Sequence, residues 1–142
     1  MPIVIEVDTP RGTVGIVHAE VQQGLSWQEF VTLIENGDKT VTETALWGRT
    51  RIKMTDSDGV RGIGRVFVGH TPQWDGAKRF GNVYAVDTGA IFADMGEKEG
   101  ARLTMMNLVH TSAVLIEPSP DHSPVNVLNQ PVAQKFGNYS RG

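Results

Sequence analysis

The sequence predicts a mixed α/β domain, in which a β-sheet flanked by helices carries functional loops at its strand ends. Short runs rich in β-branched residues recur along the chain, one segment has helical periodicity, and polar or glycine-rich loops follow the apolar runs. The 142 residues suffice for a single core, which at this size buries about two thirds of the unfolded surface. Loops at strand ends are where binding side chains commonly lie.

The N-terminal segment predicts a β-hairpin. Residues 2–8 alternate in part between apolar and polar side chains, residues 10–12 (Pro-Arg-Gly) have turn chemistry, and residues 13–19 are again rich in β-branched side chains. The second strand of this hairpin is expected to end near His18.

The sequence predicts two helices after the hairpin. Over residues 26–36, Ser26 and Glu29 have the spacing of a capping box, and Asn36 and Gly37 are typical of a helix end. The apolar residues on one stripe of this helix are Trp27, Phe30, Val31 and Ile34. Residues 38–47 predict a weaker helix that leads into a loop carrying Arg49.

Three apolar runs, at residues 65–68, 82–86 and 102–109, predict further strands, and polar loops lie at the ends of all three. After residue 116 the composition changes, because four of the seven prolines and many Ser, Asn and Gln residues lie there. Residues 1–116 are therefore predicted to form the domain, and residues 117–142 an unstructured tail.

The composition excludes several classes of partner and of site. Lys and Arg number 13 against 16 Asp and Glu, so a net charge of −3 provides no basic surface for nucleic acid or an anionic membrane. Without cysteine, any metal must be held by His, Asp, Glu or Asn. No apolar run approaches the roughly 18 residues of a membrane span, and no signal peptide is evident, so we expect a cytoplasmic protein.

Two histidines stand directly after apolar strand runs. His18 follows Gly-Ile-Val and His70 follows Val-Phe-Val-Gly, and an imidazole fixed at a strand end is a good transition-metal ligand. Taken singly, a histidine at such a place is more often a structural residue held by hydrogen bonds. The spacing of the pair matches no local metal-binding motif, so spacing alone leaves both readings open.

Arg49 and Asp87 are further candidates. Arg49 lies in Trp-Gly-Arg-Thr-Arg, and a guanidinium group is well shaped to bind phosphate through two hydrogen bonds, although arginine is also common on surfaces. Asp87 begins Asp-Thr-Gly-Ala, and its carboxylate could face a metal or a histidine. Its residue types favour a turn closed by the aspartate side chain.

Four motifs in order carry a family resemblance. They are Val-His-Ala-Glu at 17–20, Leu-Trp-Gly-Arg at 46–49, Val-Gly-His-Thr-Pro at 68–72 and Tyr-Ala-Val-Asp-Thr-Gly-Ala at 84–90. From about residue 2 to about residue 109 the chain resembles the C-terminal half of the bacterial and phage protein serine/threonine phosphatases. These belong to the phosphoprotein phosphatase family of the calcineurin-like metallophosphoesterase superfamily. The resemblance implies the C-terminal part of a metallophosphoesterase β-sandwich flanked by helices.

The resemblance also implies roles for three residues. His18 and His70 would be ligands of the second metal in a binuclear site of two divalent ions, Mn²⁺ by preference, and Arg49 would bind the phosphate. The substrate would be a phosphoserine or phosphothreonine protein or a small phosphoester. Thr71 and Tyr84 would either shape the pocket or pack ordinarily, and Asp87 would be structural.

Other parts of the family's site are missing from this sequence. The Asp-x-His and Gly-Asn-His patterns, which supply the first metal's ligands and the proton donor, do not occur, so no catalytic residue is assigned. The chain alone should bind at most one ion weakly and should not hydrolyse phosphoesters efficiently. The missing N-terminal half is an expected partner. The alternatives are a non-catalytic binding or assembly module, and half of a dinucleoside polyphosphate hydrolase or phosphodiesterase of the same superfamily.

Overall fold

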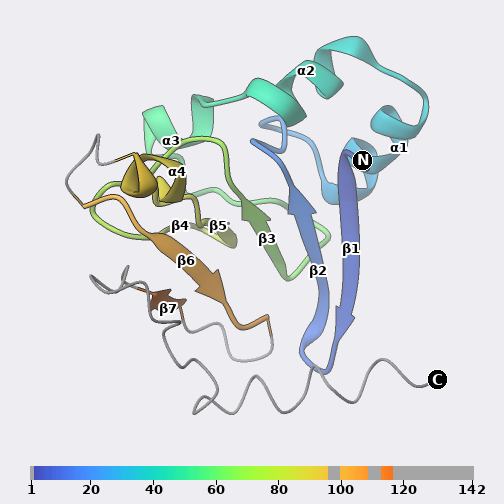
Figure 1. Ribbon diagram of the computed structural model, residues 1–142. Helices are drawn as coiled ribbons and strands as arrows, with labels where there is room; N and C mark the ends of the chain where they lie inside the picture. Colours follow the sequence, from blue (N-terminus) through green and yellow to red (C-terminus); the bar gives the residue numbers. More distant parts are fainter. Residues whose placement is uncertain (1, 96–99, 109–112, 117–142) are drawn as a thin grey trace.

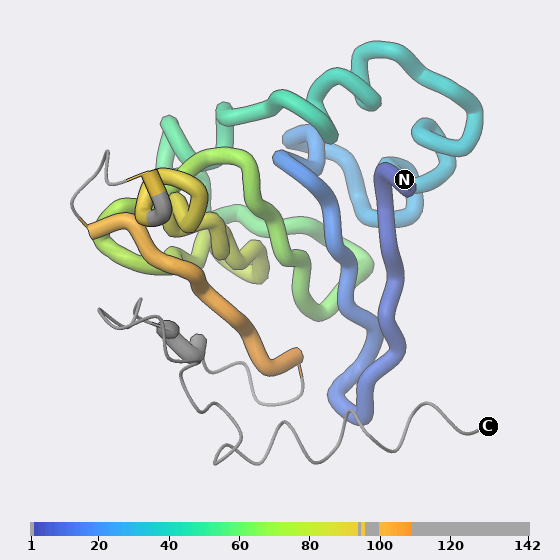
Figure 2. Tube along the Cα trace, viewed as in Figure 1, coloured from blue at the N-terminus to red at the C-terminus, as the bar shows by residue number. Residues whose placement is uncertain are grey.

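The computed structural model describes residues 2–95, 100–108 and 113–116, and it has a mixed α/β architecture (Figure 1). A five-stranded sheet has the order β1-β2-β3-β5-β4, and β6 and β7 form a separate two-stranded sheet. Figure 2 traces the chain through the hairpin, the helical crossover and the later strands. The predicted mixed α/β class is confirmed at this level, and the predicted tail at 117–142 lies outside the described residues.

The N-terminal hairpin is present as predicted. Strands β1 (Val4–Thr9) and β2 (Gly12–Val17) are antiparallel, with Val4 opposite Val17 and Thr9 opposite Gly12. Gly12 has a φ of 95°, which an L side chain rarely adopts, so the turn depends on glycine there. Strand β2 ends at Val17, and His18 is the next residue.

Three helices connect β2 to the parallel strand β3 (Arg65–Val68). They are α1 (Trp27–Glu35), α2 (Lys39–Trp47) and α3 (Thr50–Met54). The predicted capping box closes α1: Glu29 N donates to Ser26 Oγ, and Ser26 N donates to Glu29 Oε2 at 2.8 Å. The first two helices match the prediction within one or two residues, whereas α3 was not predicted.

The second half of the sheet is formed by a short antiparallel pair. Strand β5 (Val83–Ala85) runs parallel to β3, and β4 (Lys78–Phe80) pairs with its outer side. The predicted strand at 82–86 matches β5 within one residue at each end. Both end residues keep backbone hydrogen bonds to β3, because Val66 N donates to the Asn82 carbonyl and Val86 N donates to the Val68 carbonyl, each at 2.9 Å. The Asn82 side chain binds the preceding loop. Its Oδ1 accepts from Val60 N at 2.7 Å, and its Nδ2 donates to the Val60 and Ile63 carbonyls.

Helix α4 (Ala90–Asp94) and strands β6 (Leu103–Met106) and β7 (Ala113–Ile116) complete the described chain. Strand β6 corresponds to the predicted run at 102–109, whose last residue lies outside the described residues, and its pairing with β7 was not predicted. A parallel bridge between Gly89 and Arg102 connects this segment to the loop after β5.

The main core lies between the sheet and the helices that cover one of its faces. Trp27 and Phe30 of α1 pack with Val41 and Ala45 of α2 against buried strand residues. The strand residues in this cluster are Val17, Val66, Val68, Phe80, Val83 and Ala85. Gly15 makes room for the Trp27 ring, because a Cβ atom at this position would overlap the indole.

None of the helices in the described ranges is long and apolar enough to cross a membrane.

Candidate functional site

The carboxyl ends of β2 and β3 bring His18 and His70 together. The two strands are adjacent and parallel, with Val17 opposite Val68, so the residues that follow them lie at the same edge of the sheet. Gly69 N donates to the His18 carbonyl at 2.9 Å and extends the pairing past the strands. His18 Nε2 and His70 Nδ1 are 3.1 Å apart, although the residues are 52 positions apart in sequence.

His70 has an unusual backbone conformation. Its φ is 66°, and Thr71 N donates to the Gly69 carbonyl at 2.7 Å across it, so the chain makes a tight three-residue turn with His70 at its centre. Such a turn is costly for a residue with a β-carbon and is found where surrounding contacts enforce it. The turn directs the imidazole toward His18.

Arg49 reaches the same place from the loop between α2 and α3. Its Nε and one terminal nitrogen each lie 3.4 Å from His70 Nε2. Gly48 permits this approach, because a Cβ atom there would lie 2.6 Å from the Thr44 carbonyl oxygen. Trp47 stands edge-on to His70 with ring centroids 5.4 Å apart, while 69% of its surface stays exposed.

The hydrogen bonds determine the tautomer of His70. A guanidinium group can only donate, so His70 Nε2 accepts from Arg49 and the ring hydrogen lies on Nδ1, facing His18 Nε2. Partial burial lowers the pKa of His70 from its ordinary value, and the nearby Arg49 and His18 lower it further, while Asp87 opposes them. The imidazole is therefore neutral at pH 7, as a metal ligand must be.

Two of the other predicted residues, Asp87 and Tyr84, make structural contacts. Asp87 follows β5 and closes a turn, because its Oδ1 accepts from Gly89 N at 2.8 Å, as its residue type predicted. Tyr84 stacks on Phe67 with ring centroids 5.0 Å apart, which is packing within the sheet. Thr71 Oγ1 is buried and has no hydrogen bond among the described residues.

The histidine pair fits part of a metal site. Two nitrogens bound to one ion at about 2.1 Å each, at a near-right angle, lie about 3 Å apart. The observed separation of 3.1 Å is that of the hydrogen bond between the two rings, and an ion in place of the shared hydrogen would need a similar separation. Within residues 2–95, 100–108 and 113–116, no group of three or more His, Asp or Glu residues could hold an ion. An ion at this place would therefore have at most two ligands from the described residues, and its remaining positions would need water or another polypeptide.

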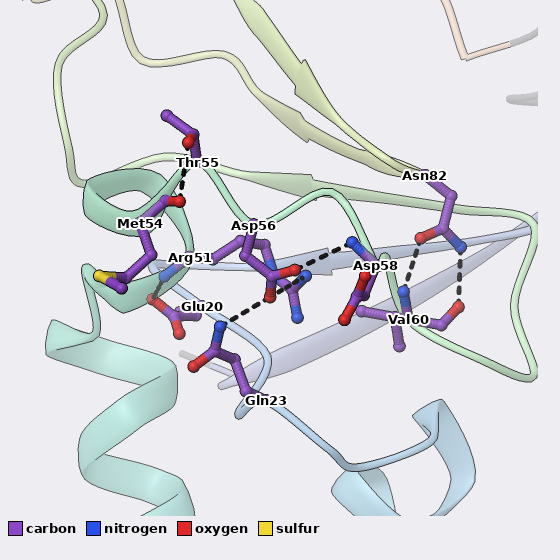
Figure 3. A network of polar contacts seen from close by, with 9 residues as sticks. All are labelled: Glu20, Gln23, Arg51, Met54, Thr55, Asp56, Asp58, Val60 and Asn82. Carbon is purple, nitrogen blue, oxygen red and sulfur yellow. Dashed lines mark hydrogen bonds and ion pairs between the residues drawn. The ribbon is translucent and has the colours of Figure 1, made fainter.

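A network of polar contacts around α3 was not predicted from the sequence (Figure 3). Glu20 and Arg51 are only 4% and 3% exposed, and Arg51 NH1 pairs with Asp56 Oδ2 at 3.0 Å. Gln23 Nε2 donates to the same carboxylate oxygen at 2.7 Å. Glu20 ends the motif at 17–20 and Arg51 lies two residues after Arg49, but the sequence assigned neither of them a role in a shared network.

Two hollows on the surface of the described residues lie away from the histidines. A groove of about 500 Å³ runs between β1 and α1, and one of about 390 Å³ lies beside Arg51 and Asp56. His18 itself is exposed at the sheet edge. A ligand would approach it from open solvent.

A scan of this chain against protein-family models finds no match, and a search of curated proteins finds none.

Proposed function

We propose that this chain is the C-terminal half of a metal-dependent phosphoester hydrolase of the phosphoprotein phosphatase family. The observation that supports this most is the convergence of His18, Arg49 and His70, which come from three separate segments and meet within hydrogen-bonding distance. The four ordered motifs support it as well. We also propose that the chain forms the C-terminal part of a metallophosphoesterase β-sandwich, as the resemblance implies.

In this proposal His18 and His70 hold one divalent ion through Nε2 and Nδ1. A bound ion would polarise the phosphoryl oxygens and lower the pKa of bound water. His70 would then keep its ring hydrogen on Nε2, where it no longer accepts from Arg49. The guanidinium group would be free to donate two hydrogen bonds to phosphate oxygens.

The proposed substrate is a phosphoserine or phosphothreonine side chain or a small phosphoester. The other metal ligands and the proton donor would come from the missing N-terminal half, so this chain alone would turn over slowly or not at all. The contact between an exposed guanidinium and a neutral imidazole also favours a second candidate, a non-catalytic module that binds phosphate without an ion.

Adding Mn²⁺ to the purified chain tests the first proposal. NMR should show paramagnetic broadening of the His18 and His70 ring signals before those of other residues, and His18→Ala or His70→Ala should abolish it. Hydrolysis of p-nitrophenyl phosphate that depends on Mn²⁺ and on both histidines would directly support the proposal that the chain belongs to a phosphoester hydrolase. Unbroadened histidines, with phosphate binding that needs only Arg49, would favour the non-catalytic module.

A further inference from the structure

The carboxylate of Glu20 is buried, and the proposed function gives it no role. It lies two residues beyond His18 and is 4% exposed, and burial raises the pKa of its carboxyl group, although amides of the Arg51 segment oppose the rise. A buried acidic group is costly unless specific hydrogen bonds offset its desolvation. The partners of Glu20 therefore indicate what it does.

Those partners lie at the beginning of α3. Glu20 Oε2 accepts from Arg51 N at 3.1 Å, and the Thr50 amide also stabilises the charged carboxylate. The residue at the helix start is Arg49, which provides no side-chain cap of its own. Glu20 thus supplies, from a distant segment, the acceptor that a helix start needs.

Glu20 also contacts the chain on the other side of Arg49. A Cβ atom on Gly48 would lie 2.8 Å from the Glu20 Cβ, so the Glu20 side chain packs against the Gly48 backbone. The neighbouring Ala19 N donates to the Ala45 carbonyl at 2.8 Å. The segment after β2 therefore holds the residues immediately before and after Arg49.

We propose that Glu20 is the positioning residue that places Arg49 beside His70. The same segment after β2 begins with His18. Residues 18–20 therefore fix the His18 imidazole directly and the Arg49 guanidinium through Glu20. Figure 3 shows Glu20 directed at the Arg51 backbone, while Asp56 binds the Arg51 side chain at the other end of α3. This inference rests on the proposed role of Arg49 as the phosphate-binding residue.

NMR of the labelled, metal-free full chain tests the positioning role. Nuclear Overhauser effects between Arg49 side-chain protons and the His70 ring should be lost in Glu20→Ala, whereas those between the two imidazoles should persist. Glu20→Gln keeps an acceptor oxygen and should retain both. Persistence of the Arg49 contact in Glu20→Ala would overturn the proposal.

Two further variants separate positioning from general loosening. Asp56→Ala removes the ion pair with Arg51 but leaves the Glu20 contact, so it should destabilise the chain and keep Arg49 beside His70. Equal loss of that contact in Asp56→Ala would count against a specific role for Glu20. If Glu20→Ala does not fold, Glu20→Asp keeps the charge, falls short of the Arg51 amide and should lose the contact.

Titration with inorganic phosphate supplies the functional readout. Glu20→Ala should weaken phosphate binding about tenfold, as much as Arg49→Ala, and the double variant should lose no more. Glu43→Ala, which removes an exposed carboxylate from α2, is the control and should bind normally. A chain that binds no phosphate would contradict the proposed role of Arg49, whereas the Overhauser effects would still decide the role of Glu20.

Discussion

His70 combines a strained backbone with a depressed pKa, and both have consequences that can be measured. Its φ of 66° holds the ring toward His18, and burial, Arg49 and His18 together disfavour its protonated form. Protonation of the His70 ring therefore destabilises the folded state.

The stability of the chain should fall as the pH is lowered through the ordinary histidine pKa of 6.5. The unfolded chain takes up the His70 proton first, because the pKa of His70 is lower in the folded state, so this contribution is complete above 6.5 and is lost below it. Arg49→Gln should bring the pKa of His70 only part of the way back to its ordinary value, because burial lowers this pKa more than Arg49 does. NMR titration of the ring and urea unfolding at two pH values measure both effects, and an unchanged His70 pKa in Arg49→Gln would contradict the assignment.

Gly15 makes a second residue-scale prediction. Gly15→Ala should destabilise the fold by about 1–3 kcal/mol, because the added methyl group would overlap the Trp27 ring in the core. Gly64→Ala is a matched control, since its Cβ would approach nothing closer than the Thr13 carbonyl at 3.9 Å. Urea unfolding compares the two variants, and equal stabilities would show that the core accommodates the extra methyl group.

Among the elements, α1 depends on its N-terminal cap. Ser26→Ala should cost about 1 kcal/mol, because the backbone amide of Glu29 in the first turn of α1 loses its acceptor. The two hydrogen bonds from Ser26 lower the pKa of Glu29, so their contribution is present above its ordinary value of 4.5 and is lost as the pH falls. The stability difference between the parent and Ser26→Ala should therefore shrink in acid. Thr32→Ala, at an exposed position within α1, should change little.

The sequence predicted the elements that have strong local patterns and missed those fixed by distant contacts. The hairpin, α1, α2, β3 and β5 have turn residues, caps or apolar runs that define them locally. Helix α3 has five residues and no apolar stripe, and its buried Arg51 pairs with Asp56, which lies outside the helix. Strand β4 has three residues, two of them exposed cations, as is typical of a sheet edge.

The two histidines of the candidate site were indicated by their positions at strand ends and by the ordered motifs, and not by secondary-structure patterns alone. The parallel pairing of β2 with β3 explains why His18 and His70 meet. Glu20 ends the motif at 17–20, but its role was not predictable because that role depends on where α3 begins. Asp87 was predicted to form a turn, and the structure confirms that turn.

At the scale of the whole molecule, β3 is the centre of the sheet. All four of its residues are buried, and it pairs with β2 on one side and β5 on the other. Amide hydrogens of β2, β3 and β5 should therefore exchange most slowly, and the outward-facing amides of the edge strands β1 and β4 much faster. Hydrogen-exchange NMR measures this order. Equal protection of the edge strands would indicate that another chain covers them.

The histidine pair also joins residues that are distant along the chain. An ion bound by both imidazoles would close a loop between positions 52 apart, and the pairing of β2 with β3 already holds the two rings together in the folded chain. An ion that binds the folded chain alone adds about 2.7 kcal/mol to its stability when free ion is at 100 times Kd. Metal availability would then shift the folding equilibrium toward the folded state, and the ion would act as a reversible cross-link between the two histidines.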